Sequence, residues 1–196
     1  MSPETLTLAS RSPRRRQLLE MLGIPVRVVP SELPEVRRPT ETPVDYVERL
    51  AREKALHVPG SLVLGADTTV VLRDEVLEKP GDPADALRML RKLQGRTHQV
   101  VTSVAVVAGG AVHQATDVTS VTFRRLTDDF LESYVATGEP MDKAGAYGIQ
   151  GFGATIVERI DGDYFAVMGL ALGRLVRLLD QMGVEYRFGT LRDASA

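Results

Sequence analysis

The chain has 196 residues, a length that fits one ordinary domain or two small lobes sharing a core. With 43% hydrophobic and 26% charged residues it is excluded from the class of disordered chains. A formal net charge of −2 excludes general attraction to nucleic acid, so anion binding needs a local cluster of cations. The absence of cysteine excludes disulfides and thiol chemistry, and the three histidines lack metal-binding spacing.

Membrane insertion and secretion are not expected either. The most apolar stretch, "VVTSVAVVAGGAVH", is interrupted by Thr, Ser and two glycines and is too short to cross a bilayer. The first residues, "MSPETLTLASRSP", lack the basic and apolar segments of a secretory signal. We therefore expect a cytoplasmic protein that binds no membrane.

Helices and strands are predicted to alternate along the chain. In order, we expect a strand at 5–10, a helix at 13–22, a strand at 24–29, a helix at 43–57, a strand at 61–66, a hairpin turning at 73–74, a helix at 83–94, two long strands around 109–110, a helix at 128–137, a hairpin turning at 161–162 and a helix at 170–182. This order predicts one α/β domain with a mixed sheet over residues 1–188, followed by a loose tail at 189–196.

The helix beginning at Ser12-Pro13 differs from the other helices that open on a Ser, Thr or Asp cap. The helices that follow Thr42, Asp82 and Thr127 carry acids in their first turn, as the helix dipole favours. After Ser12 come only Arg14, Arg15 and Arg16. Two interpretations stay open: a solvated basic face, or a site for an external polyanion held by free N–H groups, arginines and the Ser10 and Ser12 hydroxyls.

Other candidate residues occur singly. Asp67 ends a buried strand, where it either forms a turn or works on a ligand or metal; with the loop acid Glu35 it could hold Mg²⁺ or Mn²⁺. Lys54 is in phase with an apolar helix face and either snorkels outward or points its ammonium inward. Lys79 follows a strand, where a surface position is the alternative.

The segment "MDKAGAYGIQGFGATIV" is rich in glycine, which allows close backbone approach to a ligand. Gln150 within it offers both a donor and an acceptor for a base edge. A merely flexible loop is the alternative. No GxxxxGK[ST] sequence is present, so Walker-type ATPase chemistry is not expected.

Together, the blocks "LASRSPRRRQLL", "REKA", "GADTTVVL", "EKPGDPADALRMLRKLQGRTHQVVTSVAV" and "DKAGAYGIQGFGATIVERIDGDYFAVMGL" resemble the Maf family of nucleoside triphosphate pyrophosphatases. The resemblance covers nearly the whole chain; Glu78, where glycine is commoner, is a small departure. It implies an elongated fold similar to that of inosine triphosphate pyrophosphatases, with two lobes around a central cleft. It also implies metal-dependent cleavage of a nucleoside triphosphate to the monophosphate and pyrophosphate.

The resemblance assigns roles residue by residue. Asp67 is implied as the catalytic proton acceptor and Glu35 as its partner for a divalent cation, Mg²⁺ or Mn²⁺. The phosphate and transition-state ligands are implied to be Ser10, Arg14, Arg15, Lys54 and Lys79. "KAGAYGIQG" is similar to the branch that acts on dTTP and UTP, with Arg15, Thr68 and Gln150 as specificity positions.

Two functions remain as hypotheses: a pyrophosphatase of pyrimidine nucleotides, modified ones included, and a nucleotide-sensing protein that arrests septum formation through a partner. Nucleic-acid binding is disfavoured, because the chain is acidic overall and only 5% aromatic. The oligomeric state is left open, a homodimer included.

Overall fold

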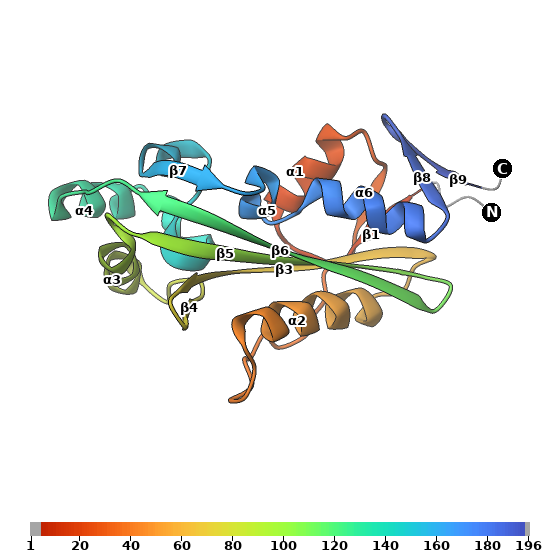
Figure 1. Ribbon diagram of the computed structural model, residues 1–196, viewed down its shortest axis with the longest axis horizontal. Helices are drawn as coiled ribbons and strands as arrows, with labels where there is room; N and C mark the ends of the chain where they lie inside the picture. Colours follow the sequence, from red (N-terminus) through yellow and green to blue (C-terminus); the bar gives the residue numbers. More distant parts are fainter. Residues whose placement is uncertain (1–4, 195–196) are drawn as a thin grey trace. The chain divides into compact units, whose positions relative to one another are not determined.

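The computed structural model describes residues 5–194, which divide into two compact units (Figure 1). The first unit holds the described residues up to Asp67, together with 102–117 and those from Gly169 onward. The second unit holds residues 68–101 and 118–168. Three long strands contribute residues to both units: β3 (Leu62–Leu72), β5 (Thr97–Ala108) and β6 (Ala111–Phe123).

A seven-stranded mixed sheet runs through the fold in the order β2-β1-β3-β5-β6-β7, with β4 paired to β3. β1 (Leu6–Leu8) lies parallel to both β2 (Val26–Val28) and β3. β4 (Glu75–Leu77) and β7 (Val157–Asp161) pair in the antiparallel sense with β3 and β6. The α/β class with a mixed sheet is therefore confirmed.

The first unit contains the helices α1 (Pro13–Met21), α2 (Pro43–His57) and α6 (Leu172–Gln181). Ala51 and Ala55 on α2 pack in one apolar cluster with Val63 on β3. The helix approaches the strand at Gly65, where an added Cβ would lie 2.2 Å from the carbonyl oxygen of Ala51. Only glycine leaves room for this contact, so Gly65 allows α2 to lie close against β3.

The second unit contains α3 (Pro83–Leu93), α4 (Asp128–Ala136), α5 (Tyr164–Met168) and short 3-10 helices at Glu139–Asp142, Ala144–Ala146 and Gly151–Thr155. Its core collects Leu90 from α3, Leu131 from α4 and the ring of Phe123 from β6. His98 on β5 is buried against the rings of Phe123 and Tyr147. Among the described residues, no helix is long and apolar enough to cross a membrane.

Most predicted elements are confirmed, including the turn between β3 and β4 and the long β5–β6 hairpin. The strand predicted at 61–66 continues without a break to Leu72. The hairpin predicted to turn at 161–162 is wrong, because β7 is followed by α5 and pairs with β6 instead. The carboxylate of Asp163 accepts hydrogen bonds from the N–H groups of Phe165 and Ala166, so it initiates a helix where a second strand was expected.

The loose tail predicted at 189–196 is also wrong over its described part. β8 (Val184–Arg187) and β9 (Thr190–Asp193) form a two-stranded sheet in which Leu191 is buried. The Tyr186 hydroxyl donates a hydrogen bond to the carbonyl oxygen of Leu22 at 2.8 Å. These contacts attach the hairpin to the end of α1, whereas residues 195–196 lie outside the described range.

Candidate functional site

The start of α1 has the composition that the sequence predicted. Ser12 is the N-cap, and its hydroxyl accepts a hydrogen bond from the N–H of Arg15. The first turn of α1 contains no acid, whereas α2, α3 and α4 carry Asp45, Asp85 and the pair Asp128–Asp129 there. The positive end of the α1 dipole is therefore not offset by an acid of its own first turn.

Arg15 is buried, with 8% of its surface exposed. Its Nη1 donates to the Ser10 hydroxyl at 3.0 Å, and its Nε donates to the carbonyl oxygen of Gly169 at 2.8 Å. Burial lowers the pKa of the Arg15 guanidinium, while the charges of Asp67 and Glu35 oppose this shift. The next residue, Arg16, is exposed and pairs with Glu20 at 2.7 Å, so the solvated interpretation applies to Arg16 and not to Arg15.

Lys54, Asp67 and Glu35 meet at one point in the first unit. The ammonium of Lys54 lies 2.6 Å from Asp67 Oδ1 and 2.7 Å from Glu35 Oε1. Lys54 is 5% exposed and Asp67 6% exposed, which shows that the ammonium points inward and that the snorkelling alternative is wrong. Burial raises the pKa of the Asp67 carboxyl, although Lys54 and Arg15 oppose the shift by favouring its charged form.

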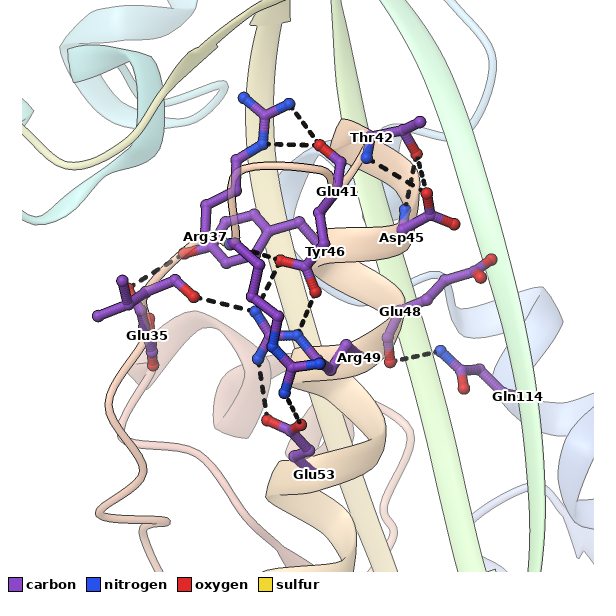
Figure 2. A network of polar contacts seen from close by, with 12 residues as sticks. Glu35, Arg37, Glu41, Thr42, Asp45, Tyr46, Glu48, Arg49, Glu53 and Gln114 are labelled. Atoms are coloured by element: carbon purple, nitrogen blue, oxygen red, sulfur yellow. Dashed lines mark hydrogen bonds and ion pairs between the residues drawn. The ribbon is translucent and has the colours of Figure 1, made fainter.

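The loop that carries Glu35 is attached to α2 by a network of hydrogen bonds (Figure 2). Arg49 on α2 forms a two-pronged contact with the carboxylate of Glu41, and its Nη2 also donates to the carbonyl oxygen of Val36 at 2.9 Å. The Tyr46 hydroxyl donates to the carbonyl oxygen of Glu35 itself at 3.2 Å (Figure 2). The Arg49 contact lowers the pKa of Glu41 to about 2. Glu35 thus extends from a loop whose backbone is bound to α2 at Glu35 itself and at the next residue, Val36.

Glu35 and Asp67 are the two described residues of this group that could hold a divalent cation together. Glu35 and Asp67 both reach one cationic group, the Lys54 ammonium, so their oxygens converge. Mg²⁺ is usually held by one or two carboxylates, with phosphate oxygens and water completing its shell. Within residues 5–194 no cluster of three or more acids or histidines could hold a metal ion, so these two carboxylates would need a ligand's oxygens to complete the shell.

Three predicted site residues belong to the second unit. Thr68 is half-buried on β3, directly after Asp67. Lys79 is exposed after β4, and Gln150 is exposed immediately before the 3-10 helix at Gly151–Thr155. The structure therefore brings together Ser10, Arg15, Glu35, Lys54 and Asp67 within one unit, which also holds the half-buried Arg14 on α1. The other three predicted residues lie in the second unit.

Sequence reasoning missed the residues that hold this site in shape. Arg49 and Tyr46 are ordinary members of an amphipathic helix by their spacing, and Glu41 is one acid in a polar loop. Glu139 and Tyr134, which bind the backbone around Gln150, were not singled out either. No sequence pattern points to them, because Arg49 lies at the edge of the apolar face of α2 and only the folded structure shows that it is buried.

Comparison with known proteins assigns the chain to a family. Residues 5–182 match the family model described as "Maf-like protein". This chain belongs to the Maf-like protein family. Similar members are each named "dTTP/UTP pyrophosphatase". The relative from Shigella sonnei is 51% identical, and the match covers 89% of this chain and 91% of the relative. The relative from Symbiobacterium thermophilum is 50% identical, over 92% of this chain and 95% of the relative. The relative from Aquifex aeolicus is 47% identical, over 90% of this chain and 95% of the relative.

The resemblance inferred from the sequence blocks is thereby confirmed for the family. Of solved structures, the Staphylococcus aureus Ham1 protein is similar to this Maf-like chain with a TM-score of 0.45 and 16% identity, over 79% of this chain and 80% of that one.

Proposed function

We propose that this chain is a nucleoside triphosphate pyrophosphatase that hydrolyses dTTP and UTP, releasing the nucleoside monophosphate and pyrophosphate. The observation that carries the proposal is the buried set of Arg15, Lys54 and Asp67, which the exposed Glu35 joins through its contact with Lys54, beside a helix start that has no acid of its own. The names of relatives at 51% and 50% identity, which align with 89% and 92% of the chain, support it.

The phosphate groups would be bound by the cations of the first unit. A triphosphate carries about four negative charges, and phosphoryl-transfer enzymes act mainly by positioning the phosphates and stabilising their charge. Arg15 is held in a fixed direction by Ser10 and Gly169, which gives it the rigid geometry suited to a phosphate oxygen. In this proposal Arg14 and the Ser10 hydroxyl add donors, and Lys54 turns from the carboxylates toward the substrate.

Asp67 would act as the proton acceptor. A water molecule adds to one of the two phosphorus atoms that flank the oxygen bridging the α- and β-phosphates, and its proton passes to Asp67. The bond between that phosphorus and the bridging oxygen breaks, and the other fragment leaves with this oxygen, so the products are the monophosphate and pyrophosphate. The raised pKa of this buried carboxyl favours proton acceptance, and release of Lys54 would raise it further. A divalent cation held by Glu35 and Asp67, when bound, supplies further neutralisation of the phosphates.

For the residues of the second unit the proposal follows the family. Thr68 and Gln150, with Arg15, would select the base, because an amide side chain can both donate to and accept from a pyrimidine edge. Lys79 would contribute one more charge for the phosphates. Catalysis is preferred over pure nucleotide sensing, since a binding protein has no need of a buried acid that can take a proton from water.

A panel of nucleotides tests the proposal. The purified protein is mixed with dTTP, UTP, the other common triphosphates and modified pyrimidine nucleotides, with and without Mg²⁺ or Mn²⁺, and the products are identified. Pyrophosphate and monophosphate from dTTP and UTP, only when the cation is present, are the expected outcome. Release of orthophosphate contradicts the reaction proposed here. Binding without turnover supports the nucleotide-sensing alternative instead.

A further inference from the structure

One carboxylate, that of Glu139, binds the backbone of the loop that carries Gln150. Glu139 Oε2 accepts a hydrogen bond from the N–H of Phe152 at 2.8 Å, and Glu139 Oε1 accepts one from the N–H of Gly153 at 2.9 Å. The Tyr134 hydroxyl donates to the same Oε1 at 2.9 Å and accepts from the N–H of Gly148 at 3.1 Å. Backbone groups on both sides of Gln150 are thus bound to one pair of side chains in the second unit.

The glycines of the loop make this contact close. An added Cβ at Gly151, where φ is +69°, would lie 2.4 Å from Glu139 Oε2. At Gly153 an added Cβ would lie 2.3 Å from the carbonyl oxygen of Gly148 and 2.6 Å from the Tyr134 hydroxyl. The glycine-rich composition therefore serves to wrap the backbone around two side chains, and the alternative of a merely flexible loop does not describe it.

The pKa shifts of Glu139 and Tyr134 keep the carboxylate charged and the hydroxyl protonated, which are the forms that these hydrogen bonds require. Burial raises the pKa of Glu139, but the N–H groups of Gly153 and Phe152 and the Tyr134 hydroxyl outweigh it, so the net shift is downward. Burial raises the pKa of Tyr134, and its hydrogen bond to Glu139 adds to this. At neutral pH the carboxylate is therefore charged and the hydroxyl protonated, which makes the contacts to Glu139 charge-assisted and correspondingly strong.

These hydrogen bonds bind only the backbone of the loop and leave the side chain of Gln150 free to reach a ligand. Gln150 is exposed although Gly148 and Gly153 on either side of it are buried. Phe152 donates its N–H to Glu139, while the residue as a whole is 65% exposed. The carboxylate therefore fixes the backbone and leaves the Gln150 amide and the Phe152 ring available to a ligand.

We propose that Glu139, assisted by Tyr134, is the positioning residue for nucleobase selection, because it fixes the backbone from which Gln150 projects. This inference rests on the proposed function, since it assigns a role within base recognition. In this role Glu139 takes part neither in binding the phosphates nor in proton transfer. Its loss should therefore reduce the discrimination between bases more than it reduces the rate of the chemical step.

Glu139→Gln is the direct test, because it keeps the size of the side chain but replaces one acceptor oxygen with a donor that faces an N–H group. We expect the ratio of kcat/KM for dTTP to that for a purine triphosphate to fall about tenfold, mainly through KM for dTTP. Tyr134→Phe should lower the ratio in the same direction by a smaller factor. Glu139→Asp, which restores the charge, should recover part of it, and Glu158→Gln on exposed β7 is the matched control.

A double-variant cycle with Gln150 separates positioning from general damage. In a Gln150→Ala background, Glu139→Gln should change the selectivity ratio no further, because the group that it positions is absent. An equal loss of kcat/KM for all nucleotides, with the ratio unchanged, overturns the proposal, as does full additivity in the cycle.

Amide hydrogen exchange gives a readout that is independent of activity. Glu139→Gln should accelerate exchange in the peptide covering residues 148–153 at least tenfold while α4 keeps its protection. Unchanged protection of this peptide overturns the positioning role. If the wild type does not hydrolyse dTTP or UTP, the proposed function fails, while the exchange experiment still decides whether Glu139 fixes the loop.

Discussion

The Lys54 ammonium on α2 lies 2.6 Å from the Asp67 carboxylate on β3, and both side chains are buried. This pair connects the helix to the strand at the centre of the candidate site. Separating two such charges in a buried place is costly, because each would lose the partner that compensates for its lost hydration. The contact exists because α2 lies close against β3, so the site depends on packing as much as on the charged residues themselves.

Asp67→Asn should abolish proton acceptance while leaving the shape of the site intact. We expect kcat to fall by about 10²–10⁴, the usual contribution of a general base, with nucleotide affinity changed by less than about tenfold. Steady-state kinetics and calorimetric titration of dTTP measure the two quantities. Asp180→Asn, on the exposed face of α6, is the control and should behave as the wild type. Full turnover in Asp67→Asn would show that the catalytic assignment is wrong.

Arg49→Lys should loosen the loop that carries Glu35, because lysine cannot form the fork with Glu41 and also reach the carbonyl oxygen of Val36. We expect the Mg²⁺ concentration for half-maximal activity to rise about tenfold, as for other residues that orient a metal ligand. In a Glu35→Gln background the same change should have little further effect.

The matched control for Arg49 is Arg52→Lys, an exposed arginine on the same helix. Binding of Mn²⁺ in the presence of a non-hydrolysable nucleotide gives a second readout that does not depend on turnover. Strict additivity of Arg49→Lys and Glu35→Gln would separate Arg49 from the loop acid and contradict this prediction.

Gly65→Ala should move α2 away from β3, because the new methyl group would meet the backbone of Ala51 and Ala55 at 2.2 and 2.6 Å. Overpacking of this kind costs about 1–3 kcal/mol of unfolding free energy, and it should also lower activity by displacing Lys54. Gly173→Ala is the contrasting variant, since nothing lies within 4 Å of its added Cβ in α6. It should stabilise the protein by about 0.5–1 kcal/mol. Equal stabilities in urea unfolding would refute this account of the α2–β3 contact.

His98 should make the stability of the protein depend on pH. Burial lowers its pKa to about 4, whereas an unfolded histidine titrates near its ordinary value of 6.5. Between these two values the unfolded chain binds a proton that the folded chain does not. The free energy of unfolding should therefore be highest above pH 6.5 and fall by about 3 kcal/mol as the pH decreases toward 4.

Comparison of His98→Gln with His57→Gln isolates this effect, because His57 is exposed at the end of α2. Urea unfolding at pH 7 and pH 5 is the measurement, and carboxylates that titrate in the same range cancel in the difference between variants. The His98 variant should lose less stability than the His57 variant on acidification. Parallel curves for the two variants would show that His98 is not the group responsible.

The sequence by itself determined the order of nearly all elements, the family and the unusual start of α1. These depend on local rules: caps, periodicity and turn residues act within a few positions, and an absent acid after Ser12 is visible in the printed chain. Local rules failed after residue 162, where a second hairpin strand was predicted. The carboxylate of Asp163 accepts from the N–H groups of Phe165 and Ala166 and starts α5 instead. Local rules also failed at the end of the described chain, where Tyr186 binds the carbonyl oxygen of Leu22.

Only the tertiary structure decided which charges work together. Lys54 was ambiguous in sequence, since its helical phase fits both an outward and an inward ammonium; the close approach of α2 at Gly65 places it against Asp67. Arg15 and Arg16 are adjacent, yet Arg15 is buried and donates to the carbonyl oxygen of Gly169, whereas Arg16 is exposed. Glu139 binds the loop that carries Gln150 because the N–H groups of Phe152 and Gly153 donate to its carboxylate. Such pairings join residues distant along the chain, so they follow from packing and not from any local pattern of residues.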